Sequence, residues 1–458
     1  MKKAFLLSIF CIAIISKSIA QSLNSKLASA YQKFIASPSL KYASVGFSVL
    51  DSKSGNVVFA RDENRGLAPA STLKVVTAAT ALDLLGPDFT YETAVAYTGK
   101  IEGNTLNGDL IITGTGDPTL GSERWEKTSK AQVLNRILFN LQQKGIQKIN
   151  GKVIADASAW DTQSLPIGWI WQDMGNYYGA GTSALCWGEN AFYLSFRPGK
   201  TAVELNKSSL TYPFLEIHNE LSSGAVGSGD NVYAYSAPYT NQIFLRGTYA
   251  IDLKKDIGLS LPNPPLAMAY DVADFLNKNG FGNIGYQAKI EGASIAGNAL
   301  FKIQSPPLSE IVYWFNQKSI NLYGEQMLRT LASKFGKSTS TIEGLRVLNN
   351  YWGKKGISEG ELNIGDGSGL SPANRASTLA MAKVLAYARQ QVWFDVFYKS
   401  IPLHNQQKMK SGTIADVLAY CGYAGEGQNL SFSIMVNNYQ GSTTQMRQQL
   451  YRFLDSLK

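Results

Sequence analysis

The sequence predicts an α+β protein whose main domain is interrupted by a long insertion. At the N-terminal end, a helix over residues 23–35 precedes a β-hairpin over residues 45–60. At the C-terminal end, a strand over residues 430–436 precedes a helix with an apolar stripe. Two short strings with reactive side chains stand 245 positions apart (319 − 74). If both belong to one site, the chain between them must form an insertion.

The first piece of the main domain spans residues 21–90. Its hairpin turns at Asp51-Ser52-Lys53-Ser54-Gly55-Asn56, a run rich in turn-forming residues. After the hairpin, Gly66-Leu67-Ala68-Pro69-Ala70 predicts a turn that leads into a helix. We therefore expect Ser71 near the N-terminus of that helix.

The insertion spans residues 91–303 and is expected to be a mixed α/β region. Residues 108–113 predict a strand and residues 131–144 predict a helix, because apolar side chains recur in the second stretch with helical spacing. Residues 271–279 predict a further short helix. Between about residues 201 and 262, short alternating strands with Gly and Ser turns indicate a nested β-rich module.

The second piece of the main domain spans residues 304–458 and ends in the helix with the apolar stripe. The spacing of its apolar side chains places them on one helical face. A membrane surface could cover this face, but packing on the sheet is the favoured interpretation. The stripe consists of Met446, Leu450, Phe453, Leu454 and Leu457.

Three strings occur in order along the chain and together indicate a serine acyl-transfer site. They are Ser71-Thr72-Leu73-Lys74, Ser319-Ile320-Asn321 and Lys410-Ser411-Gly412-Thr413. They match the pattern S-x-x-K, S-x-N and K-[ST]-G. Each string is weak evidence alone, and their occurrence together in this order carries the inference.

The first string pairs a nucleophile with a base. A serine hydroxyl is a weak nucleophile near neutral pH and needs a base within hydrogen-bond reach. Ser71 and Lys74 stand three positions apart, so on a helix they share one face. Lysine serves as a base when burial and a nearby cation, such as Lys410, lower its pKa. The alternative is an ordinary helix start, with Ser71 as its cap and Lys74 in solvent.

The other two strings supply polar groups for a cleft. Ser319 and Asn321, just before a predicted helix, offer a hydroxyl for proton relay and an amide for peptide binding; a capping or turn role is the alternative. On a predicted strand, Gly412 leaves room for a substrate backbone. A substrate carboxylate would be held by the neighbouring side chains of Lys410, Ser411 and Thr413. The alternative for this third string is an exposed basic strand edge.

With these strings, the chain resembles the low-molecular-mass class C penicillin-binding proteins, the D-alanyl-D-alanine carboxypeptidases and endopeptidases of peptidase family S13. Three further segments extend the resemblance over most of the chain. They are Gly114-Thr115-Gly116-Asp117-Pro118-Thr119-Leu120, Tyr178-Gly179-Ala180-Gly181-Thr182-Ser183-Ala184-Leu185 and Asp366-Gly367-Ser368-Gly369-Leu370-Ser371. The resemblance implies a penicillin-binding, serine β-lactamase-like transpeptidase domain, with an antiparallel sheet flanked by helices and a helical subdomain.

The resemblance also implies a mechanism. Ser71 would attack the carbonyl of a D-Ala-D-X bond and form an acyl-enzyme, with Lys74 as the general base. Backbone N–H groups of Ser71 and Thr413 would form the oxyanion hole. Water would then release the product. Penicillin mimics the D-Ala-D-Ala end and is expected to acylate the same serine.

The remaining string residues receive roles from the same resemblance. Ser319 and Asn321 would relay protons and bind substrate, and Lys410 with Thr413 would grip the terminal carboxylate. Two positions depart from the family pattern: Ile320 stands where many relatives have Asp, and Ser411 stands where Thr is commoner. Neither change removes a functional group from the expected site, so activity is still expected.

One specificity residue follows from a further similar segment. Val153-Ile154-Ala155-Asp156-Ala157-Ser158-Ala159-Trp160-Asp161 resembles a family segment whose acid binds the amino end of a peptidoglycan stem side chain. Asp156 is the best-matching position. The alternative is that Asp156 accepts hydrogen bonds within its own turn.

The expected partners are peptidoglycan stem peptides and cross-links, with β-lactams as covalent inhibitors. Two other functions stay open. A serine β-lactamase would hydrolyse its acyl-enzyme quickly, but the long insertion argues against this reading. A non-catalytic scaffold that binds the cell wall is disfavoured because every reactive group is present.

No cofactor or metal is expected. Beyond the N-terminal leader the chain has only Cys186 and Cys421, and its only histidines are His218 and His404. None has the spacing of zinc ligands, and we expect each cysteine to be an unpaired, buried thiol. The glycines at residues 114 and 116 lack the third glycine of a dinucleotide-binding loop.

Residues 1–20 predict a cleaved secretory signal and hence a periplasmic protein. Met1-Lys2-Lys3 is followed by an apolar run over residues 4–15 and then by Ser18-Ile19-Ala20 before Gln21. The run is too short to span a bilayer, and no other stretch reaches that length, so no transmembrane segment is expected in the mature chain. Losing three lysines lowers the net charge from +9 to +6 (9 − 3). The remaining charge forms no basic run typical of nucleic-acid binding.

Overall fold

The computed structural model describes residues 23–207 and 212–458, so the expected signal sequence and Cys11 lie outside the described residues. The described chain forms two compact units. The first comprises the chain up to residue 84 together with residues 312–319 and 348–458; the second comprises residues 85–311 and 320–347. The chain therefore crosses between the units four times. The expected catalytic domain, with boundaries near residues 90 and 304, stays a prediction.

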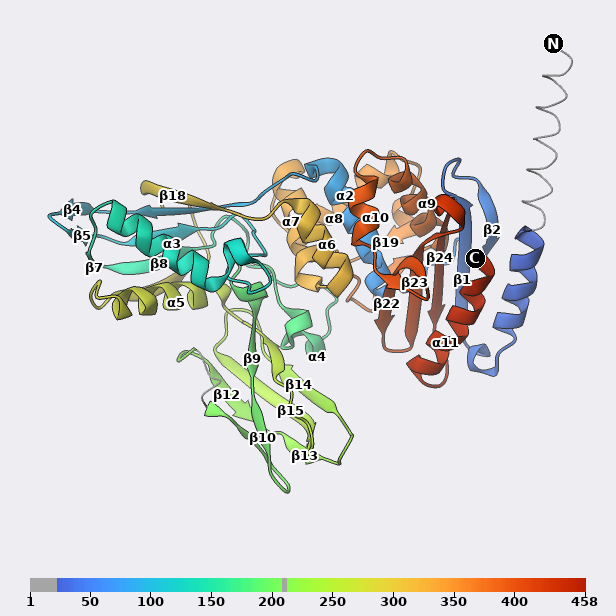
Figure 1. Cartoon of the computed structure of the whole chain (residues 1–458), viewed down its shortest axis with the longest axis horizontal. Helices are drawn as coiled ribbons and strands as arrows, with labels where there is room; N and C mark the ends of the chain where they lie inside the picture. Colours follow the sequence, from blue (N-terminus) through green and yellow to red (C-terminus); the bar gives the residue numbers. More distant parts are fainter. Residues whose placement is uncertain (1–22, 208–211) are drawn as a thin grey trace, which may run out of the picture. The chain divides into compact units, whose positions relative to one another are not determined.

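An antiparallel six-stranded sheet forms the centre of the first unit, in the order β2-β1-β24-β23-β22-β21 (Figure 1). The expected hairpin and the expected strand at residues 430–436 are confirmed as β1, β2 and β24. The strands are β1 (Ser44–Asp51), β2 (Val57–Arg61), β21 (Leu403–His404), β22 (Gln407–Ile414), β23 (Val417–Ala424) and β24 (Leu430–Asn437).

Two helices cover one face of this sheet, namely the N-terminal helix, residues 23–35, and α11 (Thr443–Leu454). The rings of Phe34 and Phe453 stack between them with centroids 4.9 Å apart. All five residues of the predicted apolar stripe are buried in this core, although α11 ends at Leu454 and Leu457 lies in the 3-10 turn that follows it. The preference for packing on the sheet over binding a membrane is therefore confirmed.

The opposite face of the sheet contacts α9 and the turn that leads into α2. Ser48 of β1 hydrogen-bonds Thr378 at the start of α9, with their hydroxyl oxygens 2.9 Å apart. The remaining elements of this unit are α2 (Lys74–Leu85), α6 (Leu308–Lys318), α8 (Thr341–Gly353), α9 (Thr378–Arg389), α10 (Phe394–Ser400), β19 (Leu362–Asn363) and β20 (Arg375–Ala376). The first residues of α6 and α8 belong to the second unit.

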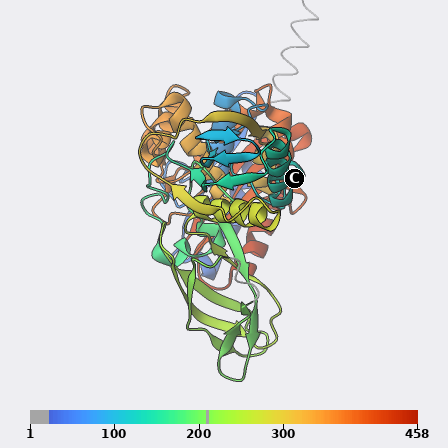
Figure 2. The same cartoon turned by 90° about the vertical axis from the view of Figure 1, so that its left-hand side faces the viewer.

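A mixed five-stranded sheet, in the order β17-β8-β6-β3-β18, forms part of the second unit. Helices α3 and α5 lie together beside this sheet and contact it (Figure 2). The elements are β3 (Glu92–Tyr97), β6 (Leu110–Thr113), β8 (Lys152–Asp156), β17 (Gly285–Lys289), β18 (Asn298–Gln304), α3 (Lys130–Gln143) and α5 (Pro264–Lys278). The strand expected at residues 108–113 is confirmed as β6.

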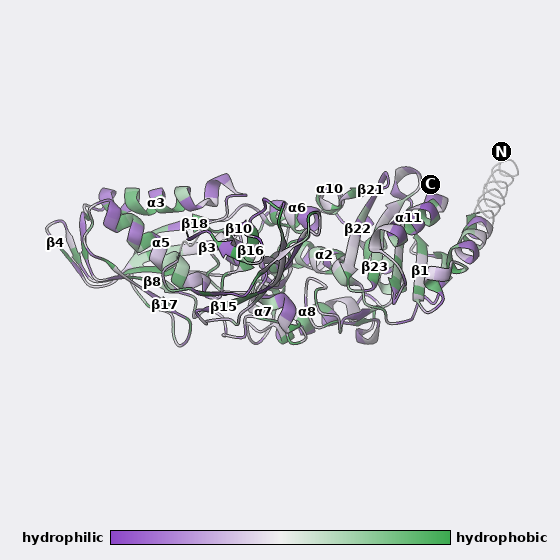
Figure 3. Cartoon of the chain, turned by 90° about the horizontal axis from the view of Figure 1, so that it is seen from below, coloured by the Kyte–Doolittle hydropathy of each residue, from purple (hydrophilic) through white to green (hydrophobic). Residues whose placement is uncertain are grey.

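The helix expected at residues 131–144 is confirmed as α3, which shows alternating hydrophobic and hydrophilic turns in Figure 3. Its N-cap side chain, Ser129, accepts a hydrogen bond from the backbone N–H of Gln132 at 3.4 Å. The second expected helix is α5, which begins seven residues before the expected residue 271 (271 − 264). Asn263 caps it, and two prolines occupy its first turn, where no N–H donor is needed.

The region expected to form a nested β module contains a four-stranded sheet in which β15 pairs with β12, β13 and β14 (Figure 1). Two more helices, α4 (Trp171–Met174) and α7 (Asn321–Phe335), belong to this second unit. The other strands are β4 (Lys100–Glu102), β5 (Thr105–Asn107), β7 (Lys148–Asn150), β9 (Ala191–Leu194), β10 (Phe196–Pro198), β11 (Val203–Leu205), β12 (Glu216–Asn219), β13 (Ser222–Gly224), β14 (Asp230–Tyr235), β15 (Gln242–Ala250) and β16 (Ile257–Ser260).

Candidate active site

A single turn of 3-10 helix, η2 (Ala70–Leu73), carries Ser71 directly into α2, which begins at Lys74. The turn starts from Pro69, and Ala70 has φ +45°, a conformation that side chains rarely adopt. The three-residue spacing brings the two reactive groups together as expected. Nζ of Lys74 donates a hydrogen bond to Oγ of Ser71 at 3.0 Å.

Lys74 is fully buried, which is unusual for a lysine. Its Nζ donates a second hydrogen bond, to the backbone carbonyl of Ser368 at 2.7 Å. Nζ also lies 5.6 Å from the centre of the Phe315 ring. This amine is held in one position inside the protein, in contrast to the solvated lysine of an ordinary helix start.

The loop that binds Lys74 is the Asp-Gly-Ser-Gly segment at residues 366–369. The buried Asp366 side chain accepts hydrogen bonds from the backbone N–H groups of Gly369 and Ser371, at 2.8 and 2.7 Å. Gly369 has φ +84°, and a side chain there would collide with the carbonyl of Ala70. The hydrogen bonds of Asp366 fix the conformation of the loop, and the absence of a side chain at Gly369 lets the loop pack closely against the turn that carries Ser71.

Sequence reasoning included this segment in the family resemblance but gave it no role in the site. Ser368 acts through its backbone carbonyl, and a carbonyl leaves no signature in the identity of a side chain. The only local signal was the composition Asp-Gly-Ser-Gly, which predicts a tight turn. A turn alone does not say which distant amine it meets.

A second amine, Lys410 on β22, is also almost fully buried, at 2 % exposure. Burial lowers the pKa of Lys410 to about 8 from its usual 10.5. Its Nζ donates to Oγ of Ser319 at 3.1 Å and to the backbone carbonyl of Ser411 at 2.8 Å. Ser319 follows the last residue of α6 and has φ +56°, so its hydroxyl is presented by a strained backbone.

Gly412 fixes how closely β22 approaches Ser71, the candidate nucleophile. Alternate residues of a strand face opposite sides, so Lys410 and Gly412 lie opposite Met409, which packs in the core under α11. A Cβ atom built on Gly412 would lie 2.6 Å from the carbonyl oxygen of Pro69 and 2.8 Å from the backbone nitrogen of Ser71. Only glycine allows the turn and the strand to pack at this distance.

Ser411 and Thr413 alternate with those two residues along β22. Ser411 is half-buried and Thr413 is exposed. In the part of the sheet that the structure describes, β21 pairs only with residues 407 and 408 of β22. The backbone of residues 411–414 is consequently an open strand edge on that side, of the kind that accepts an extended peptide.

Asn321 is the first residue of α7, in the second compact unit. Its side-chain amide donates to the backbone carbonyl of Tyr178 at 2.8 Å. Further along α7, Gln326 donates to the carbonyls of Gly116 and Ser183, both at 2.9 Å. Two of the segments that carry the family resemblance are therefore held by side chains of α7.

Asp156 lies at the end of β8, also in the second unit, and is fully buried. Its Oδ1 accepts hydrogen bonds from the backbone N–H and hydroxyl of Ser158, at 3.0 and 2.5 Å. Its Oδ2 accepts from the backbone N–H of Ile295 at 2.8 Å. The side chain thus takes part in the local turn that was the alternative to a substrate-binding role.

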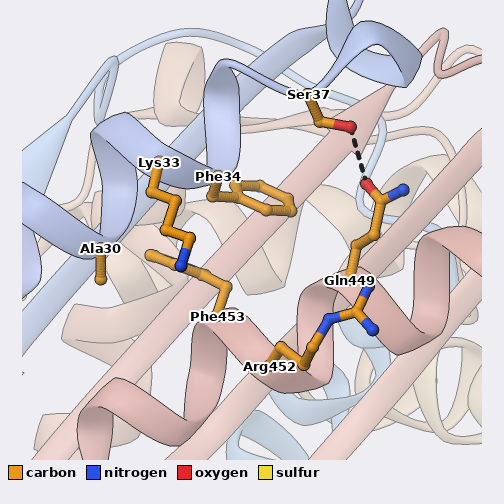
Figure 4. Close-up of a pocket in the computed structure, with 7 residues that line it drawn as sticks. All are labelled: Ala30, Lys33, Phe34, Ser37, Gln449, Arg452 and Phe453. Carbon is orange, nitrogen blue, oxygen red and sulfur yellow. Dashed lines mark hydrogen bonds between the residues drawn. The ribbon is translucent and has the colours of Figure 1, made fainter.

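Other features of the described residues lie apart from these groups. A hollow of about 390 Å³ opens between the N-terminal helix and α11 (Figure 4), and none of the string residues lines it. Within residues 23–207 and 212–458, no three His, Cys, Asp or Glu side chains form a metal-binding group. Cys186 and Cys421 are both unpaired and buried, as expected.

Within the first unit, the structure brings together several of the side chains that the sequence predicts for a serine acyl-transfer site. The buried Lys74 is hydrogen-bonded to Ser71, the candidate nucleophile, and the buried Lys410 is hydrogen-bonded to Ser319. No helix in the described part of the chain is both long and apolar enough to cross a membrane.

Comparisons with known proteins agree with this arrangement. The chain is 26% identical over 445 residues to the D-alanyl-D-alanine carboxypeptidase of Actinomadura sp. strain R39, covering 88% of this chain and 79% of that protein. It is 27% identical over 359 residues to the D-alanyl-D-alanine carboxypeptidase DacB of Haemophilus influenzae, covering 75% of this chain and 71% of that protein.

The fold is that of a solved penicillin-binding protein. The structure of penicillin binding protein 4 (dacB) from Haemophilus influenzae matches with a TM-score of 0.75 and 23% identity, over 95% of this chain and 97% of that one. The predicted penicillin-binding, serine β-lactamase-like α+β fold is thereby confirmed. Residues 27–457 match the model of the D-Ala-D-Ala carboxypeptidase 3 (S13) family. The chain therefore belongs to this family and is a hydrolase of the serine-peptidase type.

Proposed function

We propose that this protein is a periplasmic serine DD-peptidase that cleaves D-Ala-D-X bonds in peptidoglycan peptides through an acyl-enzyme on Ser71. The observation that carries the proposal is the 3.0 Å hydrogen bond between Ser71 Oγ and the buried amine of Lys74. Covalent catalysis requires a nucleophile that is hydrogen-bonded to its base. The relatives named above support the choice of substrate, since they are D-alanyl-D-alanine carboxypeptidases.

Acylation begins when Lys74 is neutral. The hydroxyl of Ser71 then donates its proton to Nζ while Oγ bonds to the carbonyl carbon of the substrate. The carbonyl of Ser368 accepts one N–H of the amine and so keeps the lone pair directed at Ser71. The C–N bond breaks as the leaving nitrogen takes that proton from Nζ of Lys74, the D-amino acid departs, and the acyl group stays on Oγ while Lys74 is neutral again.

Ser319 and Lys410 supply the proton path and the substrate grip. The hydroxyl of Ser319 and Nζ of Lys410 form a 3.1 Å hydrogen bond. When Lys410 is neutral, its amine can both donate and accept a hydrogen bond; when Lys410 is protonated, it is a cation that only donates. In its cationic form Lys410, together with Ser411 and Thr413, holds the terminal carboxylate. The open edge of β22 receives the substrate backbone beside it.

The developing oxyanion is stabilised by two backbone N–H groups, those of Ser71 and Thr413. A donor of this kind contributes about 3 to 4 kcal/mol to the transition state. Water then gives a proton to Lys74 as its oxygen bonds to the acyl carbon. The bond to Oγ breaks, and Ser71 takes that proton from Lys74. The amide of Asn321 is proposed to bind the peptide portion of the substrate.

Asp156 is proposed to bind the ammonium group of the stem side chain. A carboxylate offers about four acceptor positions. Two are used by Ser158 in the local turn and a third by the backbone N–H of Ile295, so one stays available. Asp156→Asn is expected to abolish the preference for substrates with a free amino group on that side chain. Ratios of kcat/KM for matched free and N-acetylated peptides test this role, and an unchanged ratio would remove it.

The acyl-enzyme is tested by following the intact mass of the protein after adding benzylpenicillin. A stable one-to-one adduct on the wild type that is missing from Ser71→Ala supports the proposal. The solved structures of the Haemophilus influenzae protein include a complex with a β-lactam, which motivates this probe. An adduct that disappears while hydrolysed drug accumulates would indicate a β-lactamase, and an adduct on Ser71→Ala would refute the assignment of the nucleophile.

The location is tested separately. Protein isolated from the periplasm of its source cells is expected to begin at Gln21. A protein found only in the cytoplasm with residues 1–20 still attached would refute a periplasmic location.

A further inference from the structure

A groove of about 500 Å³ lies in the second unit, next to β9. Figure 1 shows β9 as a green strand. Strand β9 pairs with β16. The groove is of the size that holds a small organic ligand. Its lining includes Ser122, Arg124, Lys130, Glu189, Tyr193 and Tyr212.

Glu189 is the centre of the polar wall of this groove. Its Oε1 accepts hydrogen bonds from Ser122 Oγ at 2.9 Å, from Arg124 Nε at 2.8 Å and from the hydroxyl of Tyr323 at 2.7 Å. Arg124 also reaches Oε2 through its Nη2 at 3.2 Å. The result is a planar carboxylate and a planar guanidinium fixed side by side, both still partly exposed to the groove.

The backbone that presents Glu189 is strained. Gly188, Glu189 and Asn190 have φ values of +61°, +57° and +50°, three left-handed residues in succession, of which only the first is glycine. The side chain of Asn190 fixes this path by accepting from the backbone N–H of Trp187 at 3.0 Å and donating to the carbonyl of Gly181 at 2.8 Å. Strain that the surrounding structure maintains in this way is characteristic of functional sites.

Two tyrosine rings project into solvent beside this polar wall. Tyr193 is 58 % exposed and Tyr177 is 55 % exposed. Both border Gly258 on β16, where an added Cβ would lie 2.9 Å from Cε1 of Tyr193 and 3.1 Å from Cβ of Tyr177. The two side chains are therefore neighbours, and Tyr193 itself lines the groove.

The charges that line the groove balance. Arg124 and Lys130 are matched by Glu189 and Glu123, and Lys130 is also paired with Asp271 at 2.7 Å. The groove therefore offers many hydrogen-bond donors and acceptors, but it has no net positive charge that would attract a polyanion. Its preferred ligand is an uncharged molecule with many hydroxyl or amide groups and one apolar face.

We propose that this groove binds a sugar unit of the peptidoglycan glycan strand. The hydroxyl and N-acetyl groups of a hexosamine match the paired carboxylate and guanidinium, and the C–H face of its ring stacks on Tyr193 as an apolar surface does on an aromatic ring. This inference rests on the proposed function, because it is the substrate polymer that brings a glycan to the protein. The groove then holds the polymer while its peptides are cut elsewhere on the protein.

The test titrates the full mature protein with tri-N-acetylchitotriose, and then with glycan strands freed of peptide, by isothermal calorimetry. Tyr193→Ala is expected to weaken binding about fivefold or more, the loss that one aromatic stacking contact produces. Tyr42→Ala is the matched control, because Tyr42 is an equally exposed tyrosine, at 61 %, in the other unit. Thermal unfolding of each variant checks that the fold is retained.

Activity measurements separate this inference from the proposed function. Tyr193→Ala is expected to leave turnover of a short, sugar-free D-Ala-D-Ala peptide unchanged and to slow digestion of polymeric peptidoglycan. No heat of binding with either glycan, or equal binding by wild type and Tyr193→Ala, would overturn the glycan site. Binding of stem peptides alone at this groove would also overturn it. If the wild type forms no penicillin adduct and turns over no D-Ala-D-Ala peptide, the proposed function is overturned instead.

Discussion

Gly412 shows how the absence of one side chain fixes the position of the turn that carries Ser71, the proposed nucleophile. The strand and the turn that carries Ser71 approach so closely that a methyl group at residue 412 has no space. Packed backbone cannot yield without moving the turn, and displacements of a fraction of an ångström reduce the rate of reactions that depend on alignment.

Gly412→Ala is therefore expected to slow acylation by benzylpenicillin on the order of 100-fold. Gly360→Ala is the control, because a Cβ there meets nothing within 4 Å and its backbone is not left-handed. Stopped-flow or quenched mass measurements give the acylation rate of each variant. An acylation rate in Gly412→Ala equal to that of the control would show that the turn tolerates displacement.

The lowered pKa of Lys410, together with its proposed role in holding the substrate carboxylate, is expected to make substrate binding depend on pH. Burial lowers its pKa to about 8, so in the folded protein the cation is lost above that pH, while in the unfolded chain it persists to about 10.5. Below about pH 8 the buried cation lowers the folding stability. The free energy of unfolding therefore increases as pH rises from about 8 to about 10.5, where the folded protein binds fewer protons than the unfolded chain. If Lys410 holds the substrate carboxylate as proposed, binding of that carboxylate is expected to weaken above about pH 8, where the cation is lost.

The expected result is a fall in kcat/KM for peptides with a free terminal carboxylate as pH rises through about 8. Lys410→Arg keeps the charge at high pH, so its falling limb is expected to move upward even if its overall activity is lower. The profile is measured as kcat/KM against pH for both proteins. A falling limb at the same pH in Lys410→Arg would assign it to another group.

Among the elements, the loop that carries Asp117 shows how a segment singled out by sequence can be structural. Asp117 is buried, and its Oδ1 accepts two hydrogen bonds from Thr119, at 2.8 Å from the backbone N–H and 2.7 Å from the hydroxyl. Among the described residues its Oδ2 has no partner. Burial raises the pKa of Asp117 to about 6 from 3.8, since the charged form is poorly solvated.

A raised carboxyl pKa costs stability as the group ionises, so the loss begins near pH 4 and is complete above about pH 6. Asp117→Asn keeps an oxygen for Thr119 and cannot ionise. Its free energy of unfolding relative to wild type is expected to rise by about 2 to 3 kcal/mol between pH 4 and pH 7. Urea unfolding at the two pH values measures this, with the exposed Asp88→Asn as control; an equal change in both variants would contradict the buried ionisation.

The sequence predicted those elements whose signals are local. The hairpin at β1 and β2, helix α3 and the stripe of α11 follow from turn composition and periodicity, and the spacing of Ser71 and Lys74 follows from helical geometry. Helix α5 was predicted too short at its N-terminal end, where its first turn contains two prolines.

The parts of the site that sequence did not predict depend on contacts between distant backbone segments. The carbonyl of Ser368 reaches Lys74 across 294 positions (368 − 74), and Gly412 meets the turn at Pro69 from even further along the chain. The resemblance to the family indicated that residues 366–371 matter, but not why. Physical reasoning on a single sequence has no access to such pairs until the fold is known.

At the scale of the whole molecule, the two thiols report on the two units separately. Cys186 lies in the second unit and Cys421 in the first, and both are fully buried. Burial raises the pKa of each thiol, to about 12 for Cys421, so neither forms the reactive thiolate near neutral pH.

The native mature protein is expected to gain no label from a thiol reagent at pH 8, and to gain two labels in denaturant. At intermediate denaturant, peptide mapping shows which thiol reacts first and hence which unit opens first. Labels that appear together would indicate one cooperative unfolding step. Rapid labelling of either cysteine without denaturant would contradict its burial.

The four crossings of the chain between its compact units have a consequence for protein engineering. The second unit is assembled from residues 85–311 and from the separate stretch 320–347, and the last residue before that stretch is Ser319. No single continuous segment of the sequence therefore encodes the second unit. A chimera that exchanged residues 85–311 alone would pair this chain's α7 with a foreign segment, whose backbone would have to offer the carbonyls of residues 178 and 116 to Asn321 and Gln326 in the same positions. Swapping this part between relatives requires two coordinated grafts, one of which ends a single residue away from a motif serine.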